Sequence, residues 1–228
     1  NAGSILEDSS QRGLAHFLEH MAFNGTKSFP EGKLVDYLES IGMGFGADIN
    51  AYTSFDETVY KLTVPTDSGN FLNTGLQVLQ EWAQAVTIDS IEVEKERGVI
   101  LEEWRQRRSV QARLQDKQLP LIFAGSRYAN RLPIGDLDVI RTAPRSELVR
   151  FYNEWYRPDL MGVIVVGDID VDAIETQVKE LFGALQARDP KARERFTTEL
   201  PGVKEPQVQV LTDPELTSQS VSILFRGE

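Results

Sequence analysis

The chain has 228 residues and is 41% hydrophobic, which is enough to bury the core of one large domain or of two small ones. Its 24 Lys and Arg residues against 35 Asp and Glu residues give a formal net charge of −11. This balance argues against a nucleic-acid partner, because binding to a phosphate backbone depends on basic surface. The absence of cysteine excludes disulfides and thiolate ligands, and no apolar run is long enough to span a membrane. The start at Asn1, without a methionine, indicates a processed protein or a fragment of a longer one.

A first helix is predicted over residues 13–23, where apolar side chains recur at helical spacing. It carries the sequence His-Phe-Leu-Glu-His, which puts His16, Glu19 and His20 on one face of the helix. Two imidazole groups four residues apart beside a glutamate are typical of an inverted zincin zinc site. Because the chain has only these two histidines and no cysteine, any third protein ligand is expected to be a carboxylate.

The remaining elements are predicted from hydrophobic periodicity and from capping and turn residues. Helices are expected over 33–41, 70–86, 91–119 and 145–155, and after Gly167-Asp168 to about 185; strands are expected over 48–53, 58–64, 161–166, 207–211 and 220–225. The first two strands are close enough in sequence to form a hairpin. Strands and helices do not alternate regularly, so the predicted fold class is α+β, with a mostly antiparallel sheet covered by helices.

Five sequence blocks extend the histidine motif along the chain, in the order GLAHFLEHMAFNGT, NAYTSFDETVY, ERGVILEEW, PIGDLDVI and YRPDLMGVIVVGDID. Together they resemble the pitrilysin family of zinc peptidases, which includes insulin-degrading enzyme and the mitochondrial processing peptidase. The stretches AFNGTKSFP and EEWR are most similar to the bacterial zinc-protease branch of that family. The resemblance covers residues 3–170, extends more loosely to the end of the chain, and implies one zinc ion per domain.

The family places a third zinc ligand on its long second helix, seven residues after a helper glutamate. Glu103 and Glu96 match these two positions. Seven residues make almost two helical turns, so both carboxylates project from the same face, whereas Glu102 points about 100° away. Spacing alone still allows Glu96 or Glu102 as the ligand.

The resemblance therefore implies that His16, His20 and Glu103 bind zinc and leave one position for water. Glu19 is expected to act as the general base on a zinc-activated water in peptide hydrolysis. Glu96 would orient the ligands or tune Glu19, and the alternative is an ion-pair partner on the helix surface.

The substrate in this family lies as an added strand against the sheet edge beside the zinc. The block Asn50-Ala51-Tyr52-Thr53 is similar to that edge, with Asn50, Ala51 and Tyr52 as the expected substrate-binding residues. Such pairing reads the peptide main chain, which fits a peptidase acting on peptides or unfolded polypeptides. Asn50 either contacts the substrate or caps the hairpin.

Family members join this domain to a homologous partner half, covalent or separate, which closes the cleft and contributes an Arg and a Tyr. Residues 1–186 are therefore expected to form a catalytic domain that lacks the family's N-terminal strands and hydrolyses poorly alone. Residues 187–202 are expected to form a linker, and residues 203–228 to be closing strands or the start of the next domain.

The bacterial branch implies a periplasmic or cell-envelope location, with the cytoplasm as the alternative. The alternative function is a non-catalytic scaffold or interaction subunit, although such members have eroded zinc motifs and this motif is intact.

Overall fold

The computed structural model describes residues 1–30, 32–66, 70–203 and 205–225. Within these ranges the α-helices are α1 (Leu14–Asn24), α2 (Lys33–Ser40), α3 (Phe71–Gln84), α4 (Ser90–Gln106), α5 (Val110–Ile122), α6 (Leu137–Thr142), α7 (Arg145–Trp155) and α8 (Val171–Gly183), and the strands are β1 (Ile49–Thr53) and β2 (Thr58–Leu62). The predicted α+β class with an antiparallel sheet is confirmed, although helices dominate and the sheet has two strands. No helix in the described ranges has the length and apolar character needed to cross a membrane.

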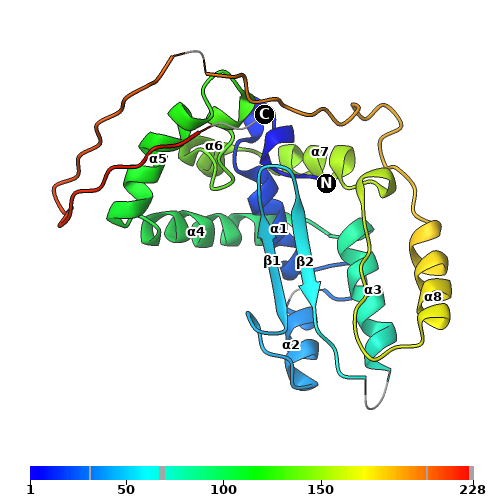
Figure 1. The fold of residues 1–228 in the computed structure, drawn as a ribbon. Helices are drawn as coiled ribbons and strands as arrows, with labels where there is room; N and C mark the ends of the chain where they lie inside the picture. The colour runs from blue at the N-terminus through cyan, green and yellow to red at the C-terminus, as the bar shows by residue number, and fades with distance from the viewer. Residues whose placement is uncertain (31, 67–69, 204, 226–228) are drawn as a thin grey trace.

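The centre of the fold is α1, which contacts β1, α4 and α7 (Figure 1). Its apolar side is fully packed, because Leu14, Phe17, Leu18 and Met21 are each at most 1% exposed. Burial of each such side chain contributes about 1.5–3 kcal/mol to the driving force for folding. The opposite edge of α1 carries the two histidines, so the hydrophobic effect sets the direction in which the histidines point.

The predicted hairpin is confirmed, with β1 and β2 antiparallel and Ile49 opposite Leu62. Its inner side packs on α1 and α3: Ile49 is fully buried, and the Tyr60 ring lies 5.2 Å from the Trp82 ring. Trp82 in turn donates a hydrogen bond of 3.0 Å to the carbonyl of Ala22 in α1. The hairpin is therefore fixed to the same helix that carries the histidines.

The single helix predicted over 91–119 was wrong, because the structure has two helices there. The first, α4, ends at Gln106, and α5 begins at Val110. The break falls at Ser109, whose backbone is extended. The side-chain hydroxyl of Ser109 caps α5 by accepting the N–H of Ala112 at 3.3 Å. A serine that competes in this way for backbone hydrogen bonds favours a helix start over a helix interior.

The strands predicted over 161–166, 207–211 and 220–225 were also wrong. These segments are extended in Figure 1 but join no ladder in the described ranges, and Ile164 and Val221 are 86% and 93% exposed. A strand is stabilised by hydrogen bonds to a neighbouring strand, and periodicity in the sequence says nothing about whether one is adjacent.

The segment 187–202 has no regular secondary structure, but arginines tie it to the body of the protein. Arg193 forms ion pairs with Asp8 at 2.9 Å and with Glu154. The guanidinium of Arg188 lies 3.9 Å from the centre of the Tyr152 ring. These contacts fasten the segment to α7 and to the N-terminal turns, and the division of the chain into domains stays a prediction.

The start of α1 is held by a backbone contact between Gly13 and Gly135. Both glycines have positive φ, +99° and +82° respectively, a region that side chains disfavour. A Cβ added to Gly135 would overlap the Cα of Gly13, and a Cβ added to Gly13 would lie 2.9 Å from the Cα of Gly135. The loop around Gly135 can reach α1 only because neither residue has a side chain.

We predict that Gly135→Ala lowers the free energy of unfolding by at least about 2 kcal/mol, through the left-handed backbone and the overlap with Gly13. Gly98→Ala is the control, since Gly98 lies in the exposed face of α4 with open space around it and should gain about 0.5–1 kcal/mol. Denaturant unfolding of the two variants measures both effects. Equal stability of Gly135→Ala and the unmodified protein would contradict the assigned contact.

Candidate metal centre

The packing of α1 against α4 brings three potential metal ligands together. The Nε2 atoms of His16 and His20 are 3.3 Å apart, and Glu103 Oε2 lies 3.6 Å from the first and 3.4 Å from the second. Tetrahedral zinc with bonds of about 2.0–2.2 Å places its ligand atoms about 3.3–3.6 Å from one another. The triangle therefore has the dimensions of a zinc site.

The carboxylate of Glu103 has one oxygen directed at the histidines and one directed away. Its Oε2 is buried and accepts no hydrogen bond among the described residues, while Oε1 lies 2.5 Å from Arg107 Nη2. A buried oxygen without a partner is unfavourable unless a cation satisfies it. Glu102, the alternative ligand, points into solvent toward Arg105, with a side chain that is 54% exposed. The donor set thus fits zinc, with Glu103 as the carboxylate that meets both imidazoles.

Glu96 contacts the other ring nitrogen of His20. The distance from His20 Nδ1 to Glu96 Oε1 is 2.7 Å, and Glu96 Oε2 accepts a hydrogen bond of 2.9 Å from Asn24 Nδ2. A carboxylate on the outer nitrogen fixes the ring and directs Nε2 at a metal, as in many zinc sites. This position matches the orienting role expected for Glu96. Sequence reasoning missed Asn24, which follows His20 by four residues and so shares its helix face.

Without a cation, the two histidines differ in charge. Burial, together with the neighbouring His20, lowers the pKa of His16 to about 4. Burial also lowers the pKa of His20, but Glu103 and Glu96 outweigh it and raise the value to about 9. The metal-free centre at neutral pH therefore holds one proton, on His20, and a metal ion has to displace it.

Glu19 lies on the same face of α1, between the two histidines in sequence. Its Oε2 accepts a hydrogen bond of 2.6 Å from the hydroxyl of Thr53 at the end of β1. Burial raises the pKa of Glu19, and the bond from Thr53 opposes that shift. The sequence placed Thr53 in the predicted edge block, but its contact with Glu19 was not predicted.

One edge of β1 is turned away from β2. The N–H of Thr63 donates a hydrogen bond to the carbonyl of Asp48, and the N–H of Ser54 donates one to the carbonyl of Glu57, both at 2.8 Å. These two bonds show which opposite residues of β1 and β2 form the hydrogen-bonded pairs of the ladder. By alternation, the main-chain groups of Ala51 point away from β2, whereas those of its neighbours on either side point toward β2.

Of the three predicted edge residues, Ala51 therefore offers its main chain and the other two offer their side chains. Asn50 Oδ1 accepts the N–H of Ala51 at 2.8 Å, and Tyr52 is 41% exposed with its hydroxyl 2.7 Å from Glu57.

A cavity of about 310 Å³ opens beside the candidate metal centre. One wall carries the polar side chains of the centre, and the other is largely apolar; the lining residues are Glu19, His20, Phe23, Asn24, Gly32, Val35, Phe45, Asn50, Ala51 and Glu96. The free edge of β1 and the candidate catalytic groups thus border one space.

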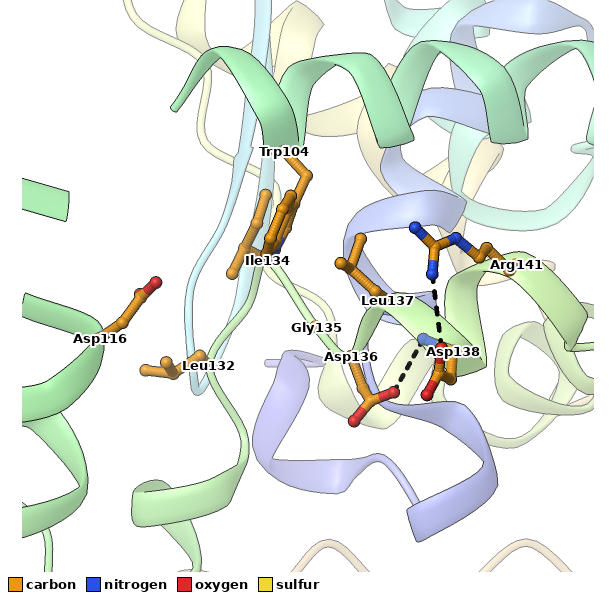
Figure 2. A pocket seen from close by; sticks show the side chains of 9 residues that line it. All are labelled: Trp104, Asp116, Leu132, Ile134, Gly135, Asp136, Leu137, Asp138 and Arg141. Atoms are coloured by element: carbon orange, nitrogen blue, oxygen red, sulfur yellow. Dashed lines mark hydrogen bonds and ion pairs between the residues drawn. The ribbon is translucent and has the colours of Figure 1, made fainter. Parts of the chain in front are cut away.

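A second cavity, of about 350 Å³, lies between α4, α5 and α6 (Figure 2). Trp104 forms one wall, and the polar lining includes three aspartates that already have partners. Asp136 pairs with Arg12 at 2.7 Å, Asp116 with Arg108 at 3.2 Å and Asp138 with Arg141 at 3.5 Å. This cavity therefore lacks the free converging ligands of the metal centre.

Two family models match the chain: insulinase (peptidase family M16) over residues 1–132 and the peptidase M16 inactive domain over residues 142–228. The first match alone covers more than half of the chain. The chain belongs to peptidase family M16. The resemblance to insulin-degrading and processing peptidases is thereby confirmed.

The M16 chain is 39% identical over 225 residues to the probable zinc protease PqqL of Haemophilus influenzae and 37% identical over 226 residues to that of Escherichia coli. Each match covers 99% of this chain and 24% of the relative, so the chain spans about a quarter of these relatives. Among solved structures, the first half of the periplasmic protease PqqL from Escherichia coli matches with a TM-score of 0.83 and 40% identity, over 89% of this chain and 43% of that one. The ferredoxin protease FusC in complex with Arabidopsis ferredoxin matches with a TM-score of 0.77 and 32% identity, over 85% and 21%.

We predict that Glu96→Gln weakens zinc binding about 10-fold, because the amide cannot accept hydrogen bonds from both His20 and Asn24. Competition with a chromogenic chelator measures the affinity. Glu102→Gln is the matched control on the same helix and should bind zinc like the unmodified protein. An unchanged affinity of Glu96→Gln would show that the contact with His20 does not support the metal.

We also predict that zinc binding at about pH 7.5 releases close to one proton, because this pH lies between the pKa of His16 and that of His20. The raised pKa of His20 means that its proton is present below about 9 and lost above it. Proton release should therefore fade toward about pH 10. Calorimetry in buffers of different ionisation enthalpy measures it, and release of two protons at about pH 7.5 would contradict the assigned charge states.

Proposed function

We propose that the protein is a zinc metallopeptidase that hydrolyses peptide bonds, with His16, His20 and Glu103 as zinc ligands. The observation that carries this proposal is the triangle of three ligand atoms 3.3–3.6 Å apart between α1 and α4. The PqqL relatives are named as probable zinc proteases, which supports zinc as the metal. A zinc ion bound by these residues would supply a Lewis acid that activates water at neutral pH.

Glu19 is the proposed general base. Because the Thr53 hydroxyl binds Oε2 of Glu19, Oε1 is assigned to take the proton from the attacking water. The water oxygen bonds to the carbonyl carbon, the carbon–nitrogen bond breaks, and Glu19 delivers the proton to the leaving amine. The burial that raises the pKa of Glu19 makes this carboxylate a stronger base and so favours acceptance of that proton.

The proposed substrate is an extended peptide or unfolded polypeptide that adds to the free edge of β1. Ala51 offers its main-chain groups there, and a bound peptide would displace the Asn50 side chain from the Ala51 N–H. The adjacent cavity, walled by Phe23, Val35 and Phe45, suits an apolar side chain next to the scissile bond. The FusC structure holds a protein, ferredoxin, which supports a polypeptide substrate.

We further propose a homologous partner half that closes over this cleft, because the chain spans 24% of its PqqL relatives and 43% of the solved first half. The proposed location is the periplasm or cell envelope, on the evidence that the matched Escherichia coli PqqL is periplasmic. The partner half would exclude water from the cleft, so the chain alone is expected to bind zinc more readily than it cleaves peptides.

We predict that Glu19→Gln lowers the rate of peptide cleavage at least about 1000-fold while zinc stays bound, because the amide cannot accept the proton. A quenched fluorescent peptide library reports cleavage, and metal analysis of the same sample reports zinc. The assay is run on the chain together with its partner half, with Glu102→Gln as the control. Full activity of zinc-loaded Glu19→Gln would remove Glu19 as the base, and a purified protein without zinc affinity would favour a non-catalytic scaffold.

A further inference from the structure

Glu7 has a fully buried carboxyl group that the proposed chemistry does not use, and burial raises its pKa to about 8. It precedes α1 by six residues, in the turn after the short 3-10 segment Ser4–Leu6. Its Oε2 accepts the N–H of Gly13 at 3.0 Å, and its Oε1 accepts the N–H of Ala15 at 2.8 Å. The backbone carbonyl of Glu7 accepts a hydrogen bond of 2.9 Å from Arg131, which holds the residue in place.

These two bonds replace a missing local cap. The first N–H groups of a helix have no partner within the helix, and a side chain at the N-cap usually binds one of them. The N-cap of α1 is Gly13, which has no side chain to do so. Glu7 supplies the acceptor from outside the helix and fastens its first turn to the N-terminal segment.

The first turn of α1 matters for the metal because it carries His16, directly after Ala15. The ring of His20 is oriented by Glu96 at 2.7 Å. In contrast, the outer nitrogen Nδ1 of His16 is buried without a hydrogen-bond partner in the described part of the chain. The position of the His16 ring therefore depends on its backbone and on packing, and the bonds from Glu7 fix that backbone.

We propose that Glu7 is a positioning residue of the metal centre: by binding the N–H groups of Gly13 and Ala15 it holds the first turn of α1, and with it His16, in the geometry that a metal requires. Glu7 orients His16 by holding its backbone, whereas Glu96 orients His20 by contacting its ring. This inference rests on the proposed zinc site and adds a residue that touches neither metal nor substrate.

The test is the affinity of Glu7→Gln for zinc, measured by chelator competition. Glutamine keeps the size of the side chain but turns one accepting oxygen into a donor, so one of the two backbone N–H groups loses its acceptor. The expected loss is about 10-fold, with an altered absorption spectrum of the cobalt-substituted protein. Asp170→Ala is the control, because Asp170 caps α8, which packs on α3, by accepting the N–H of Ala173 at 2.9 Å, and Ala removes that cap. The control should lose stability but keep its zinc affinity within about twofold.

The outcomes separate this inference from the proposed function. A Glu7→Gln variant that unfolds more easily but binds zinc and cobalt like the control would overturn the positioning role and leave Glu7 as a structural cap. An unmodified protein that does not bind zinc would overturn the proposed function itself.

A second measurement needs no variant and covers the case in which Glu7→Gln does not fold. Coupling between two sites is reciprocal, so zinc should slow hydrogen exchange of the Ala15 amide more than that of the Ala173 amide in α8. Equal slowing at both amides would reflect global stabilisation only and would contradict the proposal.

Discussion

The candidate metal centre depends on the crossing of two helices. The spacing of His16 and His20 is fixed within α1, but the distance of both from Glu103 is set only by how α4 lies on α1. Arg97 of α4, which is 9% exposed, helps to fix that crossing. Its guanidinium lies 5.6 Å from the centre of the Phe17 ring in α1 and donates a hydrogen bond of 3.0 Å to the carbonyl of Ala143. A buried guanidinium is tolerated only while its hydrogen bonds are made, so this contact resists sliding of one helix over the other.

Carboxylates gather around the two imidazoles. Glu19 and Glu96 line one cavity beside His20, Glu103 Oε2 lies 3.4 Å from His20 Nε2, and Arg107 contacts the other oxygen of Glu103. Such a group would be repulsive without a positive charge at its centre, and the proton on His20 supplies only one unit. A dication balances the site better, so the electrostatics and the distances favour the same occupant.

Sequence reasoning located the centre because helical spacing is a local property. The i, i+4 pair of histidines and the seven-residue interval between Glu96 and Glu103 follow from 3.6 residues per turn, and the structure places all four side chains as that geometry requires. The hydrogen bond from Thr53 to Glu19 was not predicted, because the two side chains meet only after β1 has packed on α1.

The errors in the fold have a related cause. The segments 161–166, 207–211 and 220–225 have the alternation of strands, but a strand also needs a neighbour, which periodicity cannot reveal. The prediction of one helix over 91–119 did not take into account that Ser109 favours an N-cap position, although this local signal was present in the sequence. Local chemistry thus specified the candidate metal ligands better than it specified the sheet.

The unpaired edge of β1 has a consequence for solubility. An open strand edge is a template for other chains, and identical copies of a protein are the most abundant strands available to it. Here the Asn50 amide oxygen already occupies the N–H of Ala51 at 2.8 Å, so a colliding copy gains little by replacing one hydrogen bond with another. An incoming chain that also fills the neighbouring apolar cavity gains more from displacing that side chain, so the Asn50 side chain disfavours nonspecific pairing at Ala51.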